Sequence, residues 1–200
     1  MPWPDDVTLK GKHASLEPLA RQHVEAAQEA ARDGELWNLW YTSVPRAEDM
    51  AAEIDRRLDL RSKGSMLPFS VKSADGRYAG MTSYMHIDAV NKRVEIGSTW
   101  YARRVQRTGL NTECKLMLLR HAFETLDCIA VEFRTSFFNH QSRRAIERLG
   151  AKLDGILRSH QRHANGTLRD TCVYSIIASE WPAVRAHLSY QLSRHNDQHD

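Results

Sequence analysis

Apolar and polar residues recur along the chain with two periods, one near 3.6 residues and one of two residues, which predicts both helices and strands. Segments of the first kind end at glycines such as Gly34 and Gly64, as helices often do. Helices are expected at residues 19–33, 46–63, 110–126, 142–149 and 179–192. Strands are expected at residues 9–18, 67–73, 78–87, 93–101, 129–135, 151–162 and 168–177. Ser179 is the expected N-cap of the last helix.

The order of these elements predicts an α/β or α+β fold with a mixed sheet. Strands precede and follow a central strand–turn–helix–strand unit at residues 93–135, which is the arrangement that joins two parallel strands. A chain of 200 residues can bury a substantial core, and this one shows no repeat or linker. We therefore expect one domain over residues 1–192, followed by a polar tail at residues 193–200.

Composition narrows the class of protein. Hydrophobic residues make up 42% of the chain and charged residues 26%, a balance typical of folded proteins. No apolar run approaches the roughly 20 residues that cross a bilayer, and residues 1–6 do not resemble a signal peptide. A net charge of +3 gives no argument for nucleic acid. Cys114, Cys128 and Cys172 are few and widely spaced, which favours buried, reduced thiols in a cytoplasmic protein. Neither a membrane nor a nucleic-acid partner is expected.

Residues 106–113 carry the most specific chemistry. They predict a basic, glycine-containing turn that ends a strand and opens a helix, with three arginines beside it: Arg103, Arg104 and Arg107. Such a turn aims backbone N–H groups and the positive end of a helix dipole at one point, where a phosphate binds well. The alternative is a solvated loop in which Gly109 only makes the turn. No Gly-Lys-Ser/Thr follows and only one glycine is present, which excludes a P-loop and a dinucleotide-binding turn.

Three motifs follow one another at a fixed spacing. The first is Glu95-Ile96-Gly97 on an expected strand, the second is Gln106-x-x-Gly109 in the turn, and the third is Asn139-x-x-Ser142 before a short helix. In this combination the chain resembles the GNAT superfamily of N-acetyltransferases, and within it the RimJ/RimL-type branch that acts on ribosomal proteins. The resemblance covers residues 9–188. One position departs from it, because the family has Gly or Ala where this chain has Asn111.

The resemblance implies a fold, a cofactor and the residues that bind it. The fold is a mixed, mostly antiparallel central sheet flanked by helices, and the cofactor is acetyl-CoA (coenzyme A). Backbone groups near Tyr101 would hold the pantetheine arm, and Asn139 would bind a pantetheine amide. The expected cofactor-binding residues are Tyr101, Arg103, Arg104, Gln106, Arg107, Thr108, Gly109, Leu110, Asn111, Thr112 and Asn139. A homodimer is a further implication of the family.

The expected reaction is direct attack of a primary amine on the thioester in a ternary complex, without a metal ion. The amine must be neutral, which at pH 7.4 costs about 4 kcal/mol for a lysine side chain but only about 0.5 kcal/mol for an α-amino group. Glu95 is the candidate general base. The alternative is that Glu95 is an exposed strand carboxylate paired with Arg93 or Lys92.

The departing thiolate needs a hydrogen-bond donor. Many family members place a tyrosine seven residues after the helix asparagine, where this chain has Ile146. The resemblance to the RimJ/RimL-type branch suggests that Ser142 acts instead. The alternative is that Asn139 and Ser142 only cap the helix that ends at Gly150.

Other chemistry-bearing residues fit less specific interpretations. The candidate substrate-binding residues are Trp37, Trp40 and Tyr41, because the segment between the first helices lines the acceptor side in this family. The alternative is that these aromatic residues make core or dimer contacts. His160 and His163 have no third ligand nearby, so no metal site is expected. Cys114 falls in the first turn of the cofactor helix, where a thiolate is favoured, but it has no identifiable base.

The sequence therefore predicts an acyltransferase that moves an acetyl group from acetyl-CoA to a protein N-terminus or a small amine. One alternative is a non-catalytic acyl-CoA-binding sensor or interaction module, which would keep the turn but would not need Glu95. Another is an enzyme that acetylates polycationic amines, which an acidic acceptor surface would bind; Glu53, Asp55 and Asp59 are the acidic residues that could contribute to one. The pattern does not identify the acceptor, because acceptors bind in variable loops.

Overall fold

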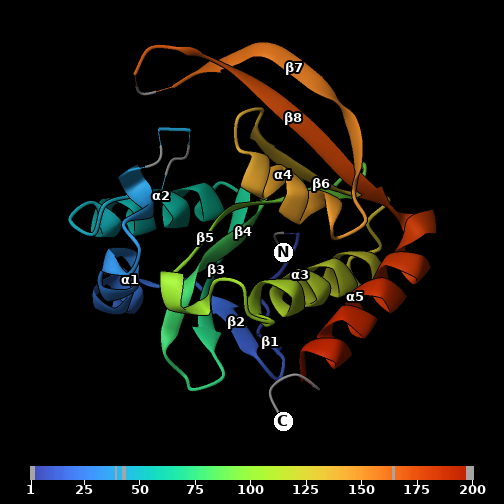
Figure 1. The fold of residues 1–200 in the computed structure, drawn as a ribbon, viewed down its shortest axis with the longest axis horizontal. Coiled ribbons are helices and arrows are strands. Elements are labelled where there is room, and N and C mark those ends of the chain that lie inside the picture. Colours follow the sequence, from blue (N-terminus) through green and yellow to red (C-terminus); the bar gives the residue numbers. More distant parts are fainter. Residues whose placement is uncertain (1–2, 39, 42–43, 164, 197–200) are drawn as a thin grey trace.

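One eight-stranded sheet runs through the structure, a computed structural model that describes residues 3–38, 40–41, 44–163 and 165–196 (Figure 1). Its strands are β1 (Leu9–Lys10), β2 (Ala14–Pro18), β3 (Met66–Ser73), β4 (Tyr78–Asp88), β5 (Arg93–Tyr101), β6 (Ala130–Ser136), β7 (Lys152–Arg162) and β8 (Leu168–Ile177). They lie in the order β1-β2-β3-β4-β5-β6-β8-β7. Only β5 and β6 are parallel neighbours within the described residues, which confirms the mixed, mostly antiparallel sheet.

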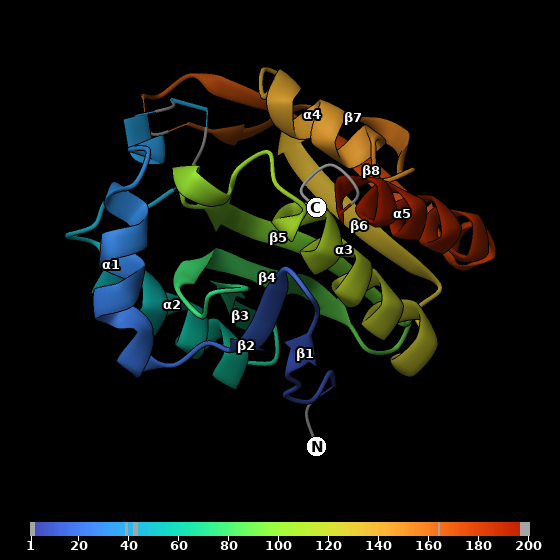
Figure 2. The ribbon, with the colours of Figure 1, turned by 60° about the horizontal axis from the view of Figure 1, so that its bottom comes forward.

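Helices cover both faces of this sheet (Figures 1 and 2). They are α1 (Val24–Arg32), α2 (Met50–Ser62), α3 (Leu110–Arg120), α4 (His140–Glu147) and α5 (Trp181–Asn196). Two adjacent residues of β4 show which face each helix covers. Ser83 accepts a hydrogen bond from Arg57 of α2, whereas the Tyr84 hydroxyl donates to the Leu118 carbonyl of α3. Because successive strand residues point to opposite faces, α2 and α3 lie on opposite sides of the sheet.

The core forms where the apolar stripes of the helices meet the sheet. Leu16, Phe69 and Met81 on the strands and Ile54 and Leu118 on the helices are fully buried. The predicted helix ends at Gly34 and Gly64 are found, and both glycines have positive φ values, 108° and 71°. Such a conformation ends a helix with little strain only where the residue has no Cβ.

Several predicted boundaries were wrong. The single strand expected at residues 9–18 is two short strands joined by a turn. The predicted Ser179 cap lies inside a 3-10 turn, Ala178–Glu180, and the Glu180 carboxylate accepts the Ile177 N–H at 3.2 Å instead. Helix α5 continues to Asn196, so the expected tail begins inside a helix, and residues 197–200 lie outside the described residues.

Two expectations from composition can be compared with the structure. Cys114, Cys128 and Cys172 are all free and buried, as predicted. Across the described ranges, no helix combines the length and the apolar character that a membrane span requires.

Candidate active site

Strands β5 and β6 pair over three residues and then separate. Their register runs from Arg93 opposite Ala130 to Glu95 opposite Glu132, and no further pair follows among the described residues. Figure 2 shows β6 leading away from β5 past this point. The side of β5 that faces β6 therefore offers unpaired backbone groups beyond Glu95, as an extended ligand requires.

A β-bulge distorts β5 in the same region, and a buried arginine supports it. Ser98 has a φ of 51°, and the register with β4 gains a residue here. Arg57 of α2, which is 2% exposed, donates to the Ser98 carbonyl at 3.1 Å and to the Ser83 hydroxyl at 3.2 Å. Glu53 balances its charge at 2.7 Å. The sequence signal was available, because Arg57 falls on the apolar stripe of its helix with Ile54.

The predicted phosphate-binding turn opens α3, with Gly109 as N-cap. The Leu110 N–H is bonded to the Thr108 hydroxyl at 3.3 Å, but no protein acceptor is found in the described part of the chain for the N–H groups of Gly109, Asn111 and Thr112. These are the donors that a helix N-terminus presents to an anion. Gly109 has a φ of −65°, which any residue adopts, so backbone conformation does not require a glycine there, whereas close approach of a ligand would.

The three arginines of the turn differ in what they contact. Arg104 is already engaged by other residues of the protein: its guanidinium donates to the Tyr78 carbonyl and lies 3.5 Å from the Asp33 carboxylate. Arg103 is held through its backbone, whose N–H donates to the Asp33 carbonyl at 2.9 Å. Its side chain is exposed to solvent. Arg107 is exposed as well. Arg103 and Arg107 are therefore the two guanidinium groups that can reach an anion at the turn.

Two further residues of the predicted set bind other parts of the protein. The Gln106 side chain donates to the Tyr101 carbonyl at 2.9 Å and ties the turn back to β5. The Thr112 hydroxyl accepts a hydrogen bond from Arg148 at 3.1 Å, so only its backbone N–H faces the turn. Burial raises the pKa of the Tyr101 hydroxyl well above its usual value, and the neighbouring Cys114 thiol adds to this effect.

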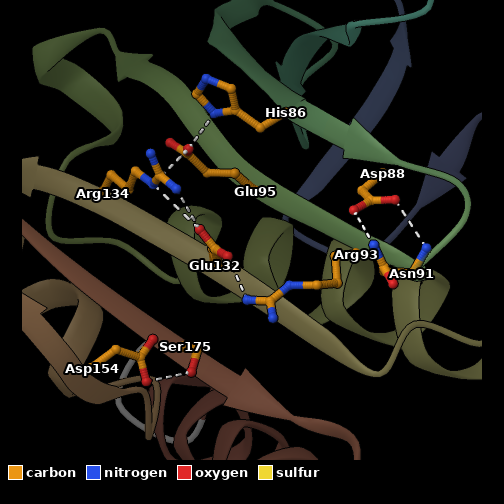
Figure 3. A network of polar contacts seen from close by, with 9 residues as sticks. All are labelled: His86, Asp88, Asn91, Arg93, Glu95, Glu132, Arg134, Asp154 and Ser175. Atoms are coloured by element: carbon orange, nitrogen blue, oxygen red, sulfur yellow. Dashed lines mark hydrogen bonds and ion pairs between the residues drawn. The ribbon is translucent and has the colours of Figure 1, made fainter.

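Glu95 lies on β5 where the two strands part, and it is buried, with 5% of its surface exposed. Its carboxylate is 2.7 Å from Nδ1 of His86 and 3.5 Å from Nε of Arg134 (Figure 3). The alternative of an exposed carboxylate paired with Arg93 or Lys92 was wrong. Arg93 binds Glu132 at 2.5 Å, and the Lys92 ammonium lies over the ring of Trp3.

His86 reaches Glu95 because β4 is also bulged. The register with β5 shifts between Met85 and Asp88, and His86 has a φ of 44°. A bulge of this kind turns a side chain toward a new direction. The hydrogen bond to Glu95 raises the pKa of His86 above its usual 6.5, against the opposing effect of burial. Sequence reasoning missed His86 and Arg134, since no local pattern reveals a bulge.

Gly97 provides the space for the Glu95 carboxylate. A Cβ at this position would lie 2.7 Å from Oε1 of Glu95 and 2.9 Å from Sδ of Met85. A glycine two residues after Glu95 is therefore required by the lack of space for a Cβ, and not by the backbone conformation of Gly97. Any larger residue would have to displace the carboxylate.

Asn139 and Ser142 lie together at the start of α4. The Asn139 side chain accepts the backbone N–H of Ser142 at 3.0 Å and caps the helix, which begins at His140 rather than at Ser142. Asn139 therefore caps the helix, as the alternative proposed, whereas Ser142 does not. Ser142 is half-buried in the first turn of α4. Ile146 is buried.

The predicted acceptor-side aromatics divide into two environments. Trp37 packs against the core, whereas Trp40 is 50% exposed and stands edge-on to Tyr41 and to His163. Trp40 also lies 5.7 Å from Phe138, the residue before the α4 cap. An open hollow of about 450 Å³ is lined by Trp40, Phe138, Asn165, Thr167 and Leu168.

The remaining candidate residues, His160 and Cys114, have other environments. His160 contacts Thr171 at 3.1 Å, and among the residues that the structure places, no three His, Cys, Asp or Glu side chains gather as a metal site would require. The expectation that Cys114 favours a thiolate was wrong, because burial raises the pKa of its thiol to about 12.

Comparison with known proteins gives consistent results. The sequence profile of the Acetyltransferase (GNAT) domain matches residues 14–152. A Bacillus subtilis (strain 168) protein, YdaF, whose name gives it provisionally as a ribosomal N-acetyltransferase, is 34% identical over 107 residues, or 54% of this chain. The match spans 57% of the length of YdaF, so the chain covers little more than half of that relative.

Two solved structures resemble the whole chain. A GCN5-related N-acetyltransferase from Brucella melitensis superposes with a TM-score of 0.85 at 29% identity, covering 96% of this chain and 87% of that one. RimJ from Mycobacterium smegmatis, solved in complex with CoA-disulfide, gives a TM-score of 0.78 at 20% identity and covers 96% of this chain and 97% of its own. At that identity the second likeness establishes the fold alone.

Proposed function

The chain belongs to the acetyltransferase (GNAT) family, and on this premise we propose that it transfers the acetyl group of acetyl-CoA to a primary amine by direct attack in a ternary complex. One observation carries the proposal. A buried carboxylate, Glu95, lies at the point where β5 separates from β6 and exposes unpaired backbone groups. A purely structural strand would not need a carboxylate buried there.

The proposed site for the coenzyme A pyrophosphate is the start of α3. The free N–H groups of Gly109, Asn111 and Thr112 fit an anion, and Arg103 and Arg107 add charge-assisted contacts. When bound, acetyl-CoA supplies the activated thioester. The unpaired side of β5 would hold the pantetheine arm by strand-like hydrogen bonds.

In the proposed mechanism Glu95 takes the proton of the attacking amine, directly or through one water. Removal of this proton by a positioned carboxylate is typically worth about 10²–10⁴ in rate. His86 and Arg134 hold the carboxylate in place, and Gly97 leaves room for it. Because His86 is half exposed, its imidazole also connects Glu95 to solvent, where the proton must finally go.

Ser142 is the proposed hydrogen-bond donor for the departing thiolate. Asn139 fixes the first turn of α4 and thereby the position of the Ser142 hydroxyl. The contribution of Ser142 should be modest, because a thiol is already a tolerable leaving group. Ser142→Ala is therefore expected to lower kcat by less than about tenfold, roughly one hydrogen bond.

For the acceptor we propose a protein N-terminus or a small amine, bound on the side of Trp40 and its hollow. The name of YdaF supports the first, since that relative is described as a ribosomal N-acetyltransferase. An α-amino group also needs much less free energy to become neutral than a lysine does. The proposal includes a cytoplasmic location, supported by free cysteines, and homodimerisation stays a prediction.

Thiol release from acetyl-CoA over a panel of peptides, amino acids, polyamines and aminoglycosides tests the proposed activity, with the acetylated product identified by mass spectrometry. Release that depends on an added amine is the expected result. Tight binding of coenzyme A without turnover across the panel would favour the sensor or interaction module instead.

Gly109→Val tests the cofactor turn. Since the φ of Gly109 suits any residue, the variant should still fold, which thermal unfolding checks, and it should lose coenzyme A binding through a side-chain clash. Normal binding by the folded variant would contradict the assignment.

A further inference from the structure

Two polar groups on one face of the sheet are buried and lack a hydrogen-bond partner among the described residues. They are Nε of Arg169 on β8 and Oγ of Ser136 at the end of β6. Ser136 is only 2% exposed. Buried polar groups in native proteins are almost always paired, so two orphaned groups together indicate a partner that the protein itself does not supply.

Both groups lie on the face that carries Glu95. Glu95 stands opposite Glu132 of β6, and alternate residues of a strand share a face, so Glu132 and Ser136 point to the same side as Glu95. Ser136 stands opposite Thr171 of β8, which places Arg169, two residues away, on that side too. Three strands therefore bring the proposed base and the two orphaned groups to one surface.

Arg169 also lacks a counter-charge. No carboxylate in the described ranges pairs with it, and its side chain donates to Gln161 at 3.1 Å. Burial lowers the pKa of its guanidinium, while the charge of Glu95 acts in the opposite direction without contact between the two groups. Arg134 differs, because Glu95 and Glu132 neutralise it.

A cation without a counter-ion, set apart from a buried carboxylate, is complementary to a ligand that carries both charges. We infer that this surface binds an acceptor with a carboxylate close to its amine, the amine directed to Glu95 and the carboxylate to Arg169 and Ser136. A guanidinium and a hydroxyl are suitable donors for a carboxylate. The inference rests on the proposed function and narrows its acceptor class.

Two sources offer this chemistry: a free amino acid, through its α-carboxylate, and a peptide N-terminus followed by an acidic side chain. The test therefore uses two matched pairs of acceptors, Ala-Asp-Ala-amide with Ala-Asn-Ala-amide, and alanine with alaninamide. Within each pair, the carboxylate is exchanged for an amide. The comparison is made between wild type and variant, so that differences in amine pKa within a pair cancel.

For at least one pair, Arg169→Gln should lower kcat/KM for the carboxylate acceptor about tenfold or more, because one charge-assisted hydrogen bond is lost. The kcat/KM for the amide acceptor should stay within about threefold of the wild-type value. Arg169→Lys should restore part of the preference, and Ser136→Ala should weaken it. Arg162→Gln removes the same charge from an exposed position on the same hairpin and should change neither acceptor. The pair that responds identifies the source of the carboxylate.

Direct titration of the same four compounds into the coenzyme A-loaded protein, by calorimetry, repeats the comparison without turnover. Equal affinity within both pairs, or an equal loss for both members in Arg169→Gln, would overturn the inference. Tighter binding of a carboxylate compound without any acetyl transfer would support the subsite and contradict the proposed function.

Discussion

At the scale of single residues, the free energy of a buried charge decides several features. Lys115 of α3 is 7% exposed, and its ammonium donates to the Thr99 hydroxyl at 3.2 Å. Burial lowers the pKa of Lys115 to about 8. The folded protein therefore holds this proton less tightly than the unfolded chain does, which costs stability at neutral pH.

Lys115→Met should stabilise the protein at pH 7, because the apolar side chain carries no desolvation penalty; the expected scale is the gain of up to about 1–4 kcal/mol seen when buried ion pairs are replaced by apolar side chains. Wild-type stability should then rise relative to the variant as pH increases from about 8 towards 10.5, because the folded-state pKa lies below the ordinary value. Denaturant unfolding at pH 7 and pH 9.5 measures both. Lys63→Met, at an exposed position, is the control, and a destabilised Lys115→Met would contradict the reasoning.

The pair His86–Glu95 should show the opposite pH dependence. The hydrogen bond raises the pKa of His86 above 6.5, so its stabilising contribution is complete below that value and is lost as pH rises through the raised pKa. Wild type should exceed His86→Gln in Tm at pH 6, and the two should converge towards pH 8. A constant difference across this range would show that His86 does not titrate against Glu95.

The sequence predicted Glu95 but not its surroundings. The Glu-x-Gly motif pointed to a functional strand, and the structure adds that Gly97 makes room for the carboxylate. His86 and Arg134 lie on the two neighbouring strands and reach Glu95 only in the folded sheet, and Arg169 of β8 lies near enough for its charge to be felt without contact. A local pattern carries no information on such meetings.

At the scale of elements, Glu113 joins α3 to the first hairpin. Its carboxylate accepts the backbone N–H groups of Lys12, His13 and Ala14 at 2.8, 2.6 and 2.8 Å. A Cβ on Gly11 would lie 2.3 Å from the same carboxyl group, so the turn and the helix fit only with a glycine there. This contact breaks the expected strand at residues 9–18 in two, and it could not be predicted because the partners lie about a hundred residues apart.

Glu113→Ala should lower the free energy of unfolding by about 1–3 kcal/mol, since three backbone donors lose their acceptor. Amide hydrogen exchange should become faster first at residues 12–14. The fold-change in the Kd for coenzyme A should be smaller than the fold-change in these exchange rates. Glu48→Ala, at an exposed position, controls for the loss of a carboxylate. Unchanged exchange at residues 12–14 would show that the carboxylate does not hold the hairpin.

Elements with strong local signals were predicted well. Strands β5 and β8 have the bounds that the alternation gave, and α1 and α2 end two residues before the predicted glycines. Their predicted starts at residues 19 and 46 were wrong, because α1 begins at Val24 after a 3-10 turn and α2 begins at Met50. The helix expected at residues 110–126 is α-helical to Arg120 and then widens into a π-type turn, His121–Thr125. Hydrophobic periodicity locates a helix but does not reveal a change of winding near its end.

At the scale of the whole molecule, the site depends on a single topological feature. The parallel strands β5 and β6 separate after three residue pairs, and the buried carboxylate lies at the last of them. The order of elements predicted a mixed sheet, but neither the length of this pairing nor the bulge that follows at Ser98, where Arg57 binds the carbonyl, could be predicted from it. Neither is visible in a hydrophobic pattern.

The steady-state kinetics of Glu95→Gln, with acetyl-CoA and an amine acceptor over pH 6–9, test the central claim most directly. We expect kcat to fall about 10²–10⁴-fold, as for loss of a general base, with the KM for acetyl-CoA nearly unchanged. Glu132→Gln, which alters the neighbouring carboxylate of the same network, should retain most of the activity. If kcat and its pH profile are the same in Glu95→Gln as in the wild type, Glu95 is not the base.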